Sequence, residues 1–190
     1  MAMEKEEAKY LQTETDYVLF CRGDMDAFAR IVYQYRAPVT AFITRLLHQT
    51  WDAEDLAADV FVELLEHPRR FRCQSSLKTY LFTIARHKTV DFLRRISRCA
   101  PADLAASDLS MPPLDNDPEL HLLAAEKQRE MQAAWKGIRE EYRLALYLTA
   151  VEELSYEEAA QVMNKSKRQI RDFCYLGRQE LRRQIKAETE

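Results

Sequence analysis

The chain has 190 residues, 47% of them hydrophobic, and a formal net charge of only −3. This balance argues against binding nucleic acid over the whole surface, and the scattered spacing of the 4 cysteines argues against disulfides or a zinc centre. Only 3 glycines and 6 prolines occur, which favours helices over sheets, so we predict an all-α protein. No apolar run approaches the roughly 20 residues of a membrane helix, and the start, MAMEKEEAKY, is too polar for a signal peptide, so we expect a cytoplasmic protein without membrane insertion.

The N-terminal half is predicted to contain long helices. Residues 1–15 are polar and predict a frayed or weakly helical extension. From Asp24 to Leu47 apolar residues recur every three or four positions, which predicts one long helix or two helices that meet at Pro38. Asp52 is placed to cap the next helix, and Pro68 ends it.

This next helix is strongly acidic, with six Asp or Glu and no Lys or Arg between Asp52 and Glu66. Asp55, Asp59 and Glu63 follow one another at four-residue spacing, so we expect them on one face, where like charges cost a few tenths of a kcal/mol per pair. A basic protein partner would offset this cost, whereas the alternative is an acidic face that only keeps the domain in solution. We predict no metal site, because the histidine and aspartate pairs at helical spacing lack further ligands.

The segment from His67 to Ser76 is predicted as a loop, and Ser75 or Ser76 begins a helix that extends to about Arg98. Nine cations face a single acid between Arg69 and Arg98. In such a loop arginines can hold phosphates, while an aromatic ring, an amide and hydroxyls hold an unstacked base. The alternative is that the aromatic rings fill the core and the arginines are merely solvated, and the residues leave the two interpretations even.

Residues 99–118 are rich in Pro, Ser and Asp and predict a flexible linker between a first domain, 16–98, and a second helical domain, 119–190. In the second domain, Ser155-Tyr156-Glu157-Glu158 predicts a capping box, and Ser166-Lys167-Arg168-Gln169 repeats the pattern. Asn164, between the two, suits the left-handed turn that ends a helix. This arrangement predicts a helix-turn-helix.

The helix after Ser166 places its apolar residues, including Ile170 and Cys174, on one face and most of its cations off that face. Eight Lys or Arg meet only two acids between Lys165 and Lys186. The chain therefore combines two local basic surfaces with one acidic helix, which indicates DNA at two places and a basic protein at a third.

Four ordered segments resemble the extracytoplasmic-function sigma factors, the smallest class of the bacterial sigma family. The resemblance extends from Gly23 to Arg183 except for the linker, and its agreement over four motifs is more specific than a lone helix-turn-helix. The segments are GDMDAFARIVYQYR, DAEDLAADVF, FRCQSSLKTYLFTIARHKTVDFLRR and LSYEEAAQVMNKSKRQIRDFCYLGRQELRR.

The resemblance implies that the first domain binds core RNA polymerase and melts the minus-ten element, while the second lies on the beta flap and recognises the minus-thirty-five element. The implied contacts with the beta-prime clamp coiled coil are Asp55, Leu56, Asp59, Phe61 and Glu63. The implied minus-ten contacts are Arg70, Phe71, Arg72, Gln74, Ser75, Ser76, Lys78, Tyr80, Arg86, Lys88, Arg94 and Arg95. The implied minus-thirty-five contacts are Lys167, Arg168, Arg171, Asp172, Tyr175 and Arg178. The implied partners are core polymerase, promoter DNA and an anti-sigma factor, with no cofactor and no catalytic residue.

Three positions depart from the family pattern. Ala58 replaces the usual Gln of the clamp-binding motif, and Tyr80 replaces the usual Trp before the melting helix. Asp172 stands within a run that is commonly basic; a carboxylate is repelled by phosphate but can accept from a cytosine amino group, which predicts an unusual minus-thirty-five sequence. Two other functions stay as alternatives: a stand-alone helix-turn-helix repressor with an N-terminal sensor domain, and a helical metal-dependent phosphohydrolase.

Overall fold

The computed structural model describes residues 15–47, 51–99, 135 and 137–189. The predicted extension up to residue 14, most of the predicted linker and the start of the second domain lie outside the described residues. All regular structure in the described ranges is helical, which confirms the all-α prediction. None of the described helices combines the length and the hydropathy that a membrane crossing requires. The described residues fall mainly into two compact units, and each is considered by itself below.

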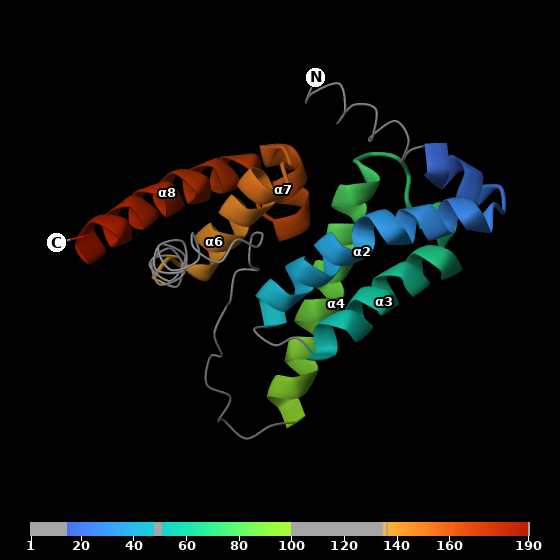
Figure 1. Cartoon of the computed structure of the whole chain (residues 1–190), viewed down its shortest axis with the longest axis horizontal. Coiled ribbons are helices and arrows are strands. Elements are labelled where there is room, and N and C mark those ends of the chain that lie inside the picture. Colours follow the sequence, from blue (N-terminus) through green and yellow to red (C-terminus); the bar gives the residue numbers. More distant parts are fainter. Residues whose placement is uncertain (1–14, 48–50, 100–134, 136, 190) are drawn as a thin grey trace, which may run out of the picture. The chain divides into compact units, whose positions relative to one another are not determined.

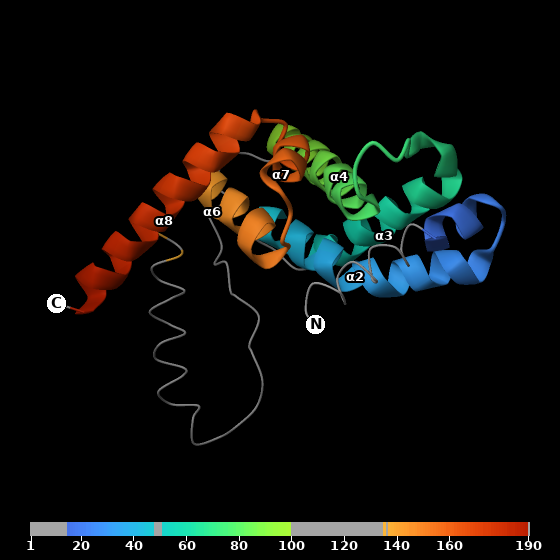
Figure 2. The same ribbon diagram turned by 90° about the horizontal axis from the view of Figure 1, so that it is seen from above.

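The first unit consists of a short helix over residues 15–21 and three longer ones, α2 (Met25–Leu47), α3 (Trp51–Glu66) and α4 (Leu77–Cys99). Helices α2 and α3 lie side by side in opposite directions, and α4 crosses both of them (Figures 1 and 2). Each of the three packs on the other two, so one core forms between them. Its largest fully buried side chains include Ile31, Val39, Phe42, Ile43, Val60, Leu64, Leu81 and Phe82.

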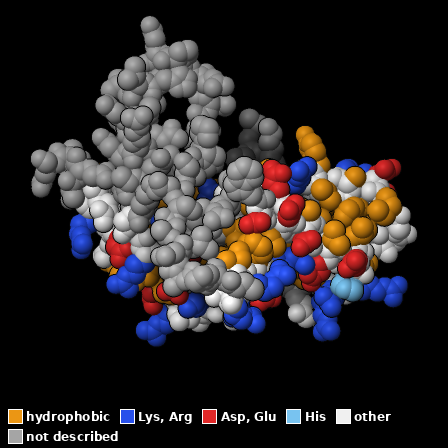
Figure 3. Space-filling view, turned by 90° about the horizontal axis from the view of Figure 1, so that it is seen from below, with side chains coloured by type: hydrophobic (Ala, Val, Ile, Leu, Met, Phe, Trp, Pro, Cys, Tyr) orange, Lys and Arg blue, Asp and Glu red, His pale blue; other side chains and the backbone are white. Residues whose placement is uncertain are grey.

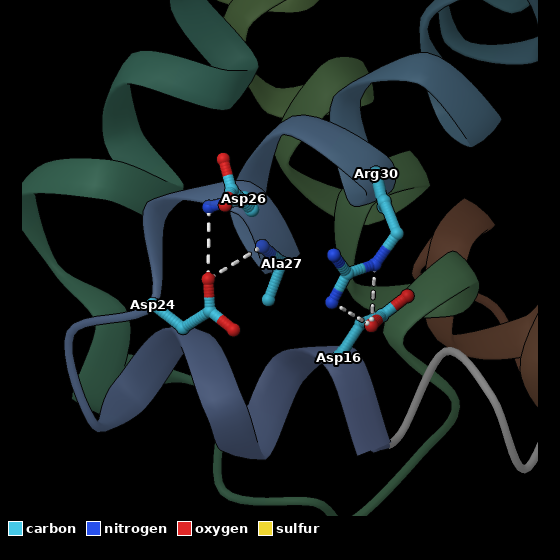
Figure 4. A network of polar contacts seen from close by, with 5 residues as sticks. All are labelled: Asp16, Asp24, Asp26, Ala27 and Arg30. Atoms are coloured by element: carbon cyan, nitrogen blue, oxygen red, sulfur yellow. Dashed lines mark hydrogen bonds and ion pairs between the residues drawn. The ribbon is translucent and has the colours of Figure 1, made fainter.

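The start of α2 is fixed by Asp24, whose Oδ1 accepts hydrogen bonds from the backbone N–H groups of Asp26 at 2.9 Å and Ala27 at 3.1 Å (Figure 4). This is a helix N-cap, which satisfies donors that the first turn leaves unpaired. In the same view Arg30 Nη2 lies 2.7 Å from Asp16 Oδ1 and ties α2 to the preceding short helix. Pro38 lies inside α2 without ending it, so the segment is one helix and not two.

Between α3 and α4 the predicted loop contains a short 3-10 helix, η1 (Pro68–Arg70). The prediction of a loop over the whole segment is wrong for these three residues, because proline suits the first position of a helical turn, where its missing N–H costs nothing. Ser76, rather than Ser75, caps α4: its Oγ accepts the N–H of Thr79 at 3.2 Å.

The second unit contains α6 (Glu140–Leu146), the π-helix η2 (Tyr147–Val151), α7 (Tyr156–Met163) and α8 (Lys167–Thr189). Both predicted capping boxes are present. Ser155 Oγ accepts the N–H of Glu158 at 3.2 Å, and the Glu158 carboxylate accepts the Ser155 N–H at 3.0 Å. Ser166 and Gln169 repeat the exchange at 3.2 and 2.9 Å. Asn164, with φ of 51°, makes the predicted left-handed turn between α7 and α8.

The buried face of α8 packs against α6. Ile170 and Cys174 are fully buried, and Cys174 is a core thiol as predicted. Gly177 also lies in this contact: a Cβ atom there would come within 2.8 Å of Leu146 Cδ1 and 3.1 Å of Tyr142 Cβ. The two helices therefore approach as closely as they do because this position has no side chain.

Candidate functional site

Helix α3 divides its residues between the core and an exposed acidic face. Asp55 and Asp59 are exposed. Leu56 and Phe61, which the family resemblance implies as polymerase contacts, are buried in the first unit. The carboxylates alone among these four residues are therefore presented to a partner.

Two exposed hydrophobic residues extend this face, and neither is among the predicted contacts. Val62 is 47% exposed and Leu65 is 40% exposed. Val62 follows Asp55 by seven residues, close to two full turns, so both lie on one side of the helix. Figure 3 shows a surface of this mixed kind, with acidic and hydrophobic side chains next to one another. The sequence could have revealed Val62 and Leu65, because both fall outside the spacing of the buried residues of α3.

Glu63 does not belong to the exposed face of α3. It lies about 80° from Asp55 around the helix axis, on the side that contacts η1 and α4, whereas Leu65 lies about 80° from Asp55 on the other side, which is exposed. Its Oε1 lies 3.2 Å from Arg70 Nη1, and its Oε2 lies 3.0 Å from Lys88 Nζ. An acid implied as a polymerase contact thus lies between two cations implied as DNA contacts.

Phe71 and Ser76, implied to hold an unstacked base, make internal contacts. Their residues are 8% and 5% exposed. The Phe71 ring meets Tyr17 edge-on at a centroid distance of 4.9 Å and packs on Tyr80 at 5.1 Å. The Ser76 hydroxyl is engaged as the cap of α4 and contacts the Thr79 hydroxyl at 2.7 Å. These contacts favour the interpretation that the Phe71 ring fills the core. They also fix the shape of the loop around Phe71.

The exposed part of this segment is polar and basic. Arg72 and Gln74 are exposed, and Ser75 is half-buried. An open surface cavity of about 430 Å³ lies beside Arg72. It is lined by Glu66, His67, Pro68, Arg69, Arg70 and Arg72. Of the predicted minus-ten contacts only Arg70 and Arg72 line this cavity, which is formed largely by η1.

Tyr17 holds this segment from the helix of residues 15–21, although the sequence gives no signal for the contact. Its hydroxyl donates to the carbonyl oxygens of Pro68 and Phe71, the latter at 3.2 Å. Burial, followed by a hydrogen bond with Cys21, raises the pKa of Tyr17, so the hydroxyl stays protonated and able to donate. The partners are 51 and 54 residues away along the chain, beyond any local pattern.

Helix α4 presents the remaining cations of the first unit. Arg94 and Arg95 are exposed, whereas Arg86 is half-buried. Burial, and then the neighbouring Arg94, lower the pKa of Arg86. Lys78 Nζ lies 5.8 Å from the centre of the Phe82 ring, a cation–π contact that directs it along the helix surface.

All side chains implied as minus-thirty-five contacts are exposed on α8. They are Lys167, Arg168, Arg171, Asp172, Tyr175 and Arg178. The helix therefore packs through one face and presents cations and one aromatic ring on the others, as its sequence predicts.

Acidic residues pair with three of these cations. Glu157 of α7 accepts a hydrogen bond from Lys167, which lowers the pKa of Glu157. Asp172 lies within 4.0 Å of Arg168 Nε and 3.8 Å of Arg171 Nε. Asp172 thus reduces the repulsion between two arginines of its own helix, and DNA would have to compete with these exposed pairs.

Within the described ranges, no three His, Cys, Asp or Glu side chains gather as metal ligands would. The surfaces found in the same ranges are one acidic and hydrophobic face and two basic faces, an arrangement suited to binding macromolecules of opposite charge.

Comparison with known proteins finds one family and several relatives of the same class. Residues 31–99 match the family described as sigma-70 region 2. The chain is 26% identical over 165 residues to the RNA polymerase sigma factor YlaC of Bacillus subtilis, with 87% of this chain and 95% of the relative covered. It is 26% identical over 172 residues to the ECF RNA polymerase sigma factor SigW of the same organism, with 87% and 92% covered.

The fold agrees with that of a solved sigma factor. The structure of RpoE from Bartonella quintana, solved in complex with the anti-sigma factor NepR, superposes with a TM-score of 0.68 at 22% identity, covering 84% of this chain and 96% of that one. Motifs, relatives and fold agree over both halves of the chain. Residues 31–99 thus form a sigma-70 region 2, and over most of its length the chain is similar to extracytoplasmic-function sigma factors of bacterial RNA polymerase.

Proposed function

We propose that this sigma factor directs core RNA polymerase to promoters through three separate surfaces. The exposed face of α3 docks on polymerase, the loop and α4 hold the minus-ten element, and α8 recognises the minus-thirty-five element. The observation that carries the proposal is that acidic and basic surfaces are exposed on different helices, because an adaptor between a basic protein and DNA needs both. A stand-alone repressor has no use for the acidic face.

The polymerase surface consists of Asp55, Asp59, Val62 and Leu65. Charged residues at a rim steer association, and hydrophobic side chains supply buried area. Leu56 and Phe61 support this surface from the core of the unit. We expect the beta-prime clamp coiled coil to be the part of polymerase that it meets, as in the family.

The minus-ten surface combines exposed contacts with a fixed frame. Arg70, Arg72 and Gln74 meet the melted strand, while Phe71 and Ser76 keep the segment in shape. A base that has left the DNA duplex stacks on the protein or forms hydrogen bonds with it. These contacts offset the few kcal/mol that unstacking the base costs. The protein contributes no catalytic residue to this step. It acts in the cytoplasm, and its two domains span residues 16–98 and 119–190.

At the minus-thirty-five element, Lys167, Arg168 and Arg178 contact phosphates. Arg171, Asp172 and Tyr175 lie nearest the base edges in the major groove. Phosphate contacts set the salt dependence of binding, and base contacts set the preferred sequence.

An anti-sigma factor is the proposed regulator. The structure of RpoE was solved in complex with the anti-sigma factor NepR. A second solved structure, CnrH in complex with the cytosolic domain of CnrY, superposes with a TM-score of 0.62 at 17% identity, covering 94% of this chain and 97% of that one. A regulator that covers the exposed face of α3 would keep this sigma factor from polymerase.

The test is transcription of a randomised duplex library by core polymerase, with and without the full-length protein. We expect transcripts that depend on both proteins and whose templates share two elements upstream of the start. Asp172→Ser should change the preferred minus-thirty-five sequence by about 1–3 kcal/mol per affected base, and Arg168→Ala should weaken all templates alike. Transcription that falls when the protein is added would support the repressor instead.

A further inference from the structure

We propose that Glu63 is a positioning residue of the minus-ten DNA surface and not a contact with polymerase. Its carboxylate holds Arg70 and Lys88 side by side, ready for the phosphates of the melted strand. This inference rests on the proposed function, and it reassigns an acid that the family resemblance implies as part of the docking helix.

The geometry joins three elements at one carboxylate. Glu63 is on α3, Arg70 ends η1, and Lys88 is on α4. The two oxygens are divided between the cations, Oε1 at 3.2 Å from Arg70 Nη1 and Oε2 at 3.0 Å from Lys88 Nζ. The Glu63 side chain is 27% exposed, and both of its oxygens are already engaged by the two cations. Lys88 is also 27% exposed and Arg70 is 60% exposed, so Arg70 is the more accessible of the two cations.

The arrangement leaves donors for DNA. A guanidinium has five N–H groups and an ammonium has three, so each cation keeps free donors after its contact with Glu63. Without the carboxylate the two cations repel each other, and Arg70 must be ordered only when DNA arrives, which weakens binding. The two ion pairs are partly exposed, so they contribute on the order of 1 kcal/mol at most to folding stability, and the effect is expected mainly on DNA binding.

Tyr80 lies in the same electrostatic environment. Burial is the main cause that raises the pKa of Tyr80, Glu63 adds to the increase, and Arg70 opposes it. The carboxylate therefore acts on a cluster in which every other member, Arg70, Lys88 and Tyr80, is a predicted minus-ten residue.

The experiment compares Glu63→Gln with Glu54→Gln in the full-length protein. Glutamine keeps the size of the side chain and removes the charge, and Glu54 is an exposed acid of the same helix, so both variants gain equally in long-range attraction to DNA. With a promoter from the library, we expect Glu63→Gln to form open complexes about five-fold more slowly, the effect of ordering one side chain. Glu54→Gln should match the wild type, and affinity for core polymerase and the melting temperature should be unchanged in both.

Two results would overturn the inference. One is an open-complex rate for Glu63→Gln equal to or above that of Glu54→Gln; the other is weaker binding of Glu63→Gln to core polymerase, which would make the residue a polymerase contact. Arg70→Ala with Lys88→Ala tests the DNA surface itself. If that double variant opens promoters normally, the proposed function fails at this surface; if it is slow and adding Glu63→Gln slows it no further, the carboxylate acts through the two cations.

Discussion

At the residue scale, exposure separates side chains that the sequence places together. Asp55 and Glu63 belong to one acidic run, yet the first is exposed and the second lies between two cations. The separation depends on α4 and η1, which come later in the chain, so no local pattern predicts it. Phe71 is a similar case, because its burial requires Tyr17 from the start of the unit.

Tyr17 gives the prediction at this scale. Tyr17→Phe keeps the ring against Phe71 but removes the hydroxyl that donates to two loop carbonyls, so we expect a loss of about 1 kcal/mol in unfolding free energy. We also expect slower open-complex formation on duplex promoters and little change on templates that are already melted. Urea unfolding and stopped-flow measurements of promoter opening check both expectations.

The matched control is Tyr33→Phe, because Tyr33 is 91% exposed on α2. It should leave stability and promoter opening unchanged. Equal behaviour of the two variants in promoter opening would show that the Tyr17 hydroxyl does not position the loop.

At the element scale, local rules predict the helices well. Each capping box needs residues only three apart, and the left-handed turn needs only Asn164, so both are visible in the sequence. The π-helix η2 and the 3-10 helix η1 are not predicted, because each inserts or removes a fraction of a turn in response to packing. The same holds for the close approach of α6 and α8 at Gly177.

Gly177→Ala tests that approach. Replacing glycine by alanine inside a helix gains up to about 1 kcal/mol of helix propensity. Here, however, the new methyl group would clash with Leu146 Cδ1 and Tyr142 Cβ. Overpacking costs about 1–3 kcal/mol, so we expect net destabilisation of the second unit, measured by thermal unfolding.

Gly137→Ala is the comparison, since its added methyl would meet only the end of the Gln184 side chain, which can move aside. Its stability should stay close to that of the wild type. A gain in stability for Gly177→Ala would mean that the helices can separate without cost.

At the scale of the whole molecule, a net charge of −3 is the sum over one acidic surface and two basic surfaces. The run of acids and the two runs of cations predict their existence, because each occupies a continuous segment. The sequence does not predict which members are exposed, since that depends on how α2, α3 and α4 share one core. Val62 and Leu65 are the clearest examples of exposed residues that the sequence did not predict as contacts.

Charge reversal tests the division of labour. Asp55→Lys with Asp59→Lys should weaken binding to core polymerase by more than about ten-fold, or about 1.4 kcal/mol. Helicity should be unchanged, because both side chains lie outside the core. Affinity measured by fluorescence titration, with circular dichroism as the folding check, decides the outcome.

Asp26→Lys with Asp91→Lys makes the same change in net charge on α2 and α4 and should bind core polymerase as the wild type does. If the two double variants lose affinity equally, overall charge and not the face of α3 determines docking.

The two capping boxes differ in the side chain that closes them, and this difference affects how strongly the start of each helix attracts phosphate. The box of α7 uses a carboxylate, Glu158, whereas the box of α8 uses a neutral amide, Gln169. The first turn of a helix carries a partial positive charge that attracts phosphate, and a carboxylate there would neutralise it. By closing the second box with an amide, the chain stabilises the start of α8 and still leaves that end of the helix attractive to the sugar-phosphate backbone.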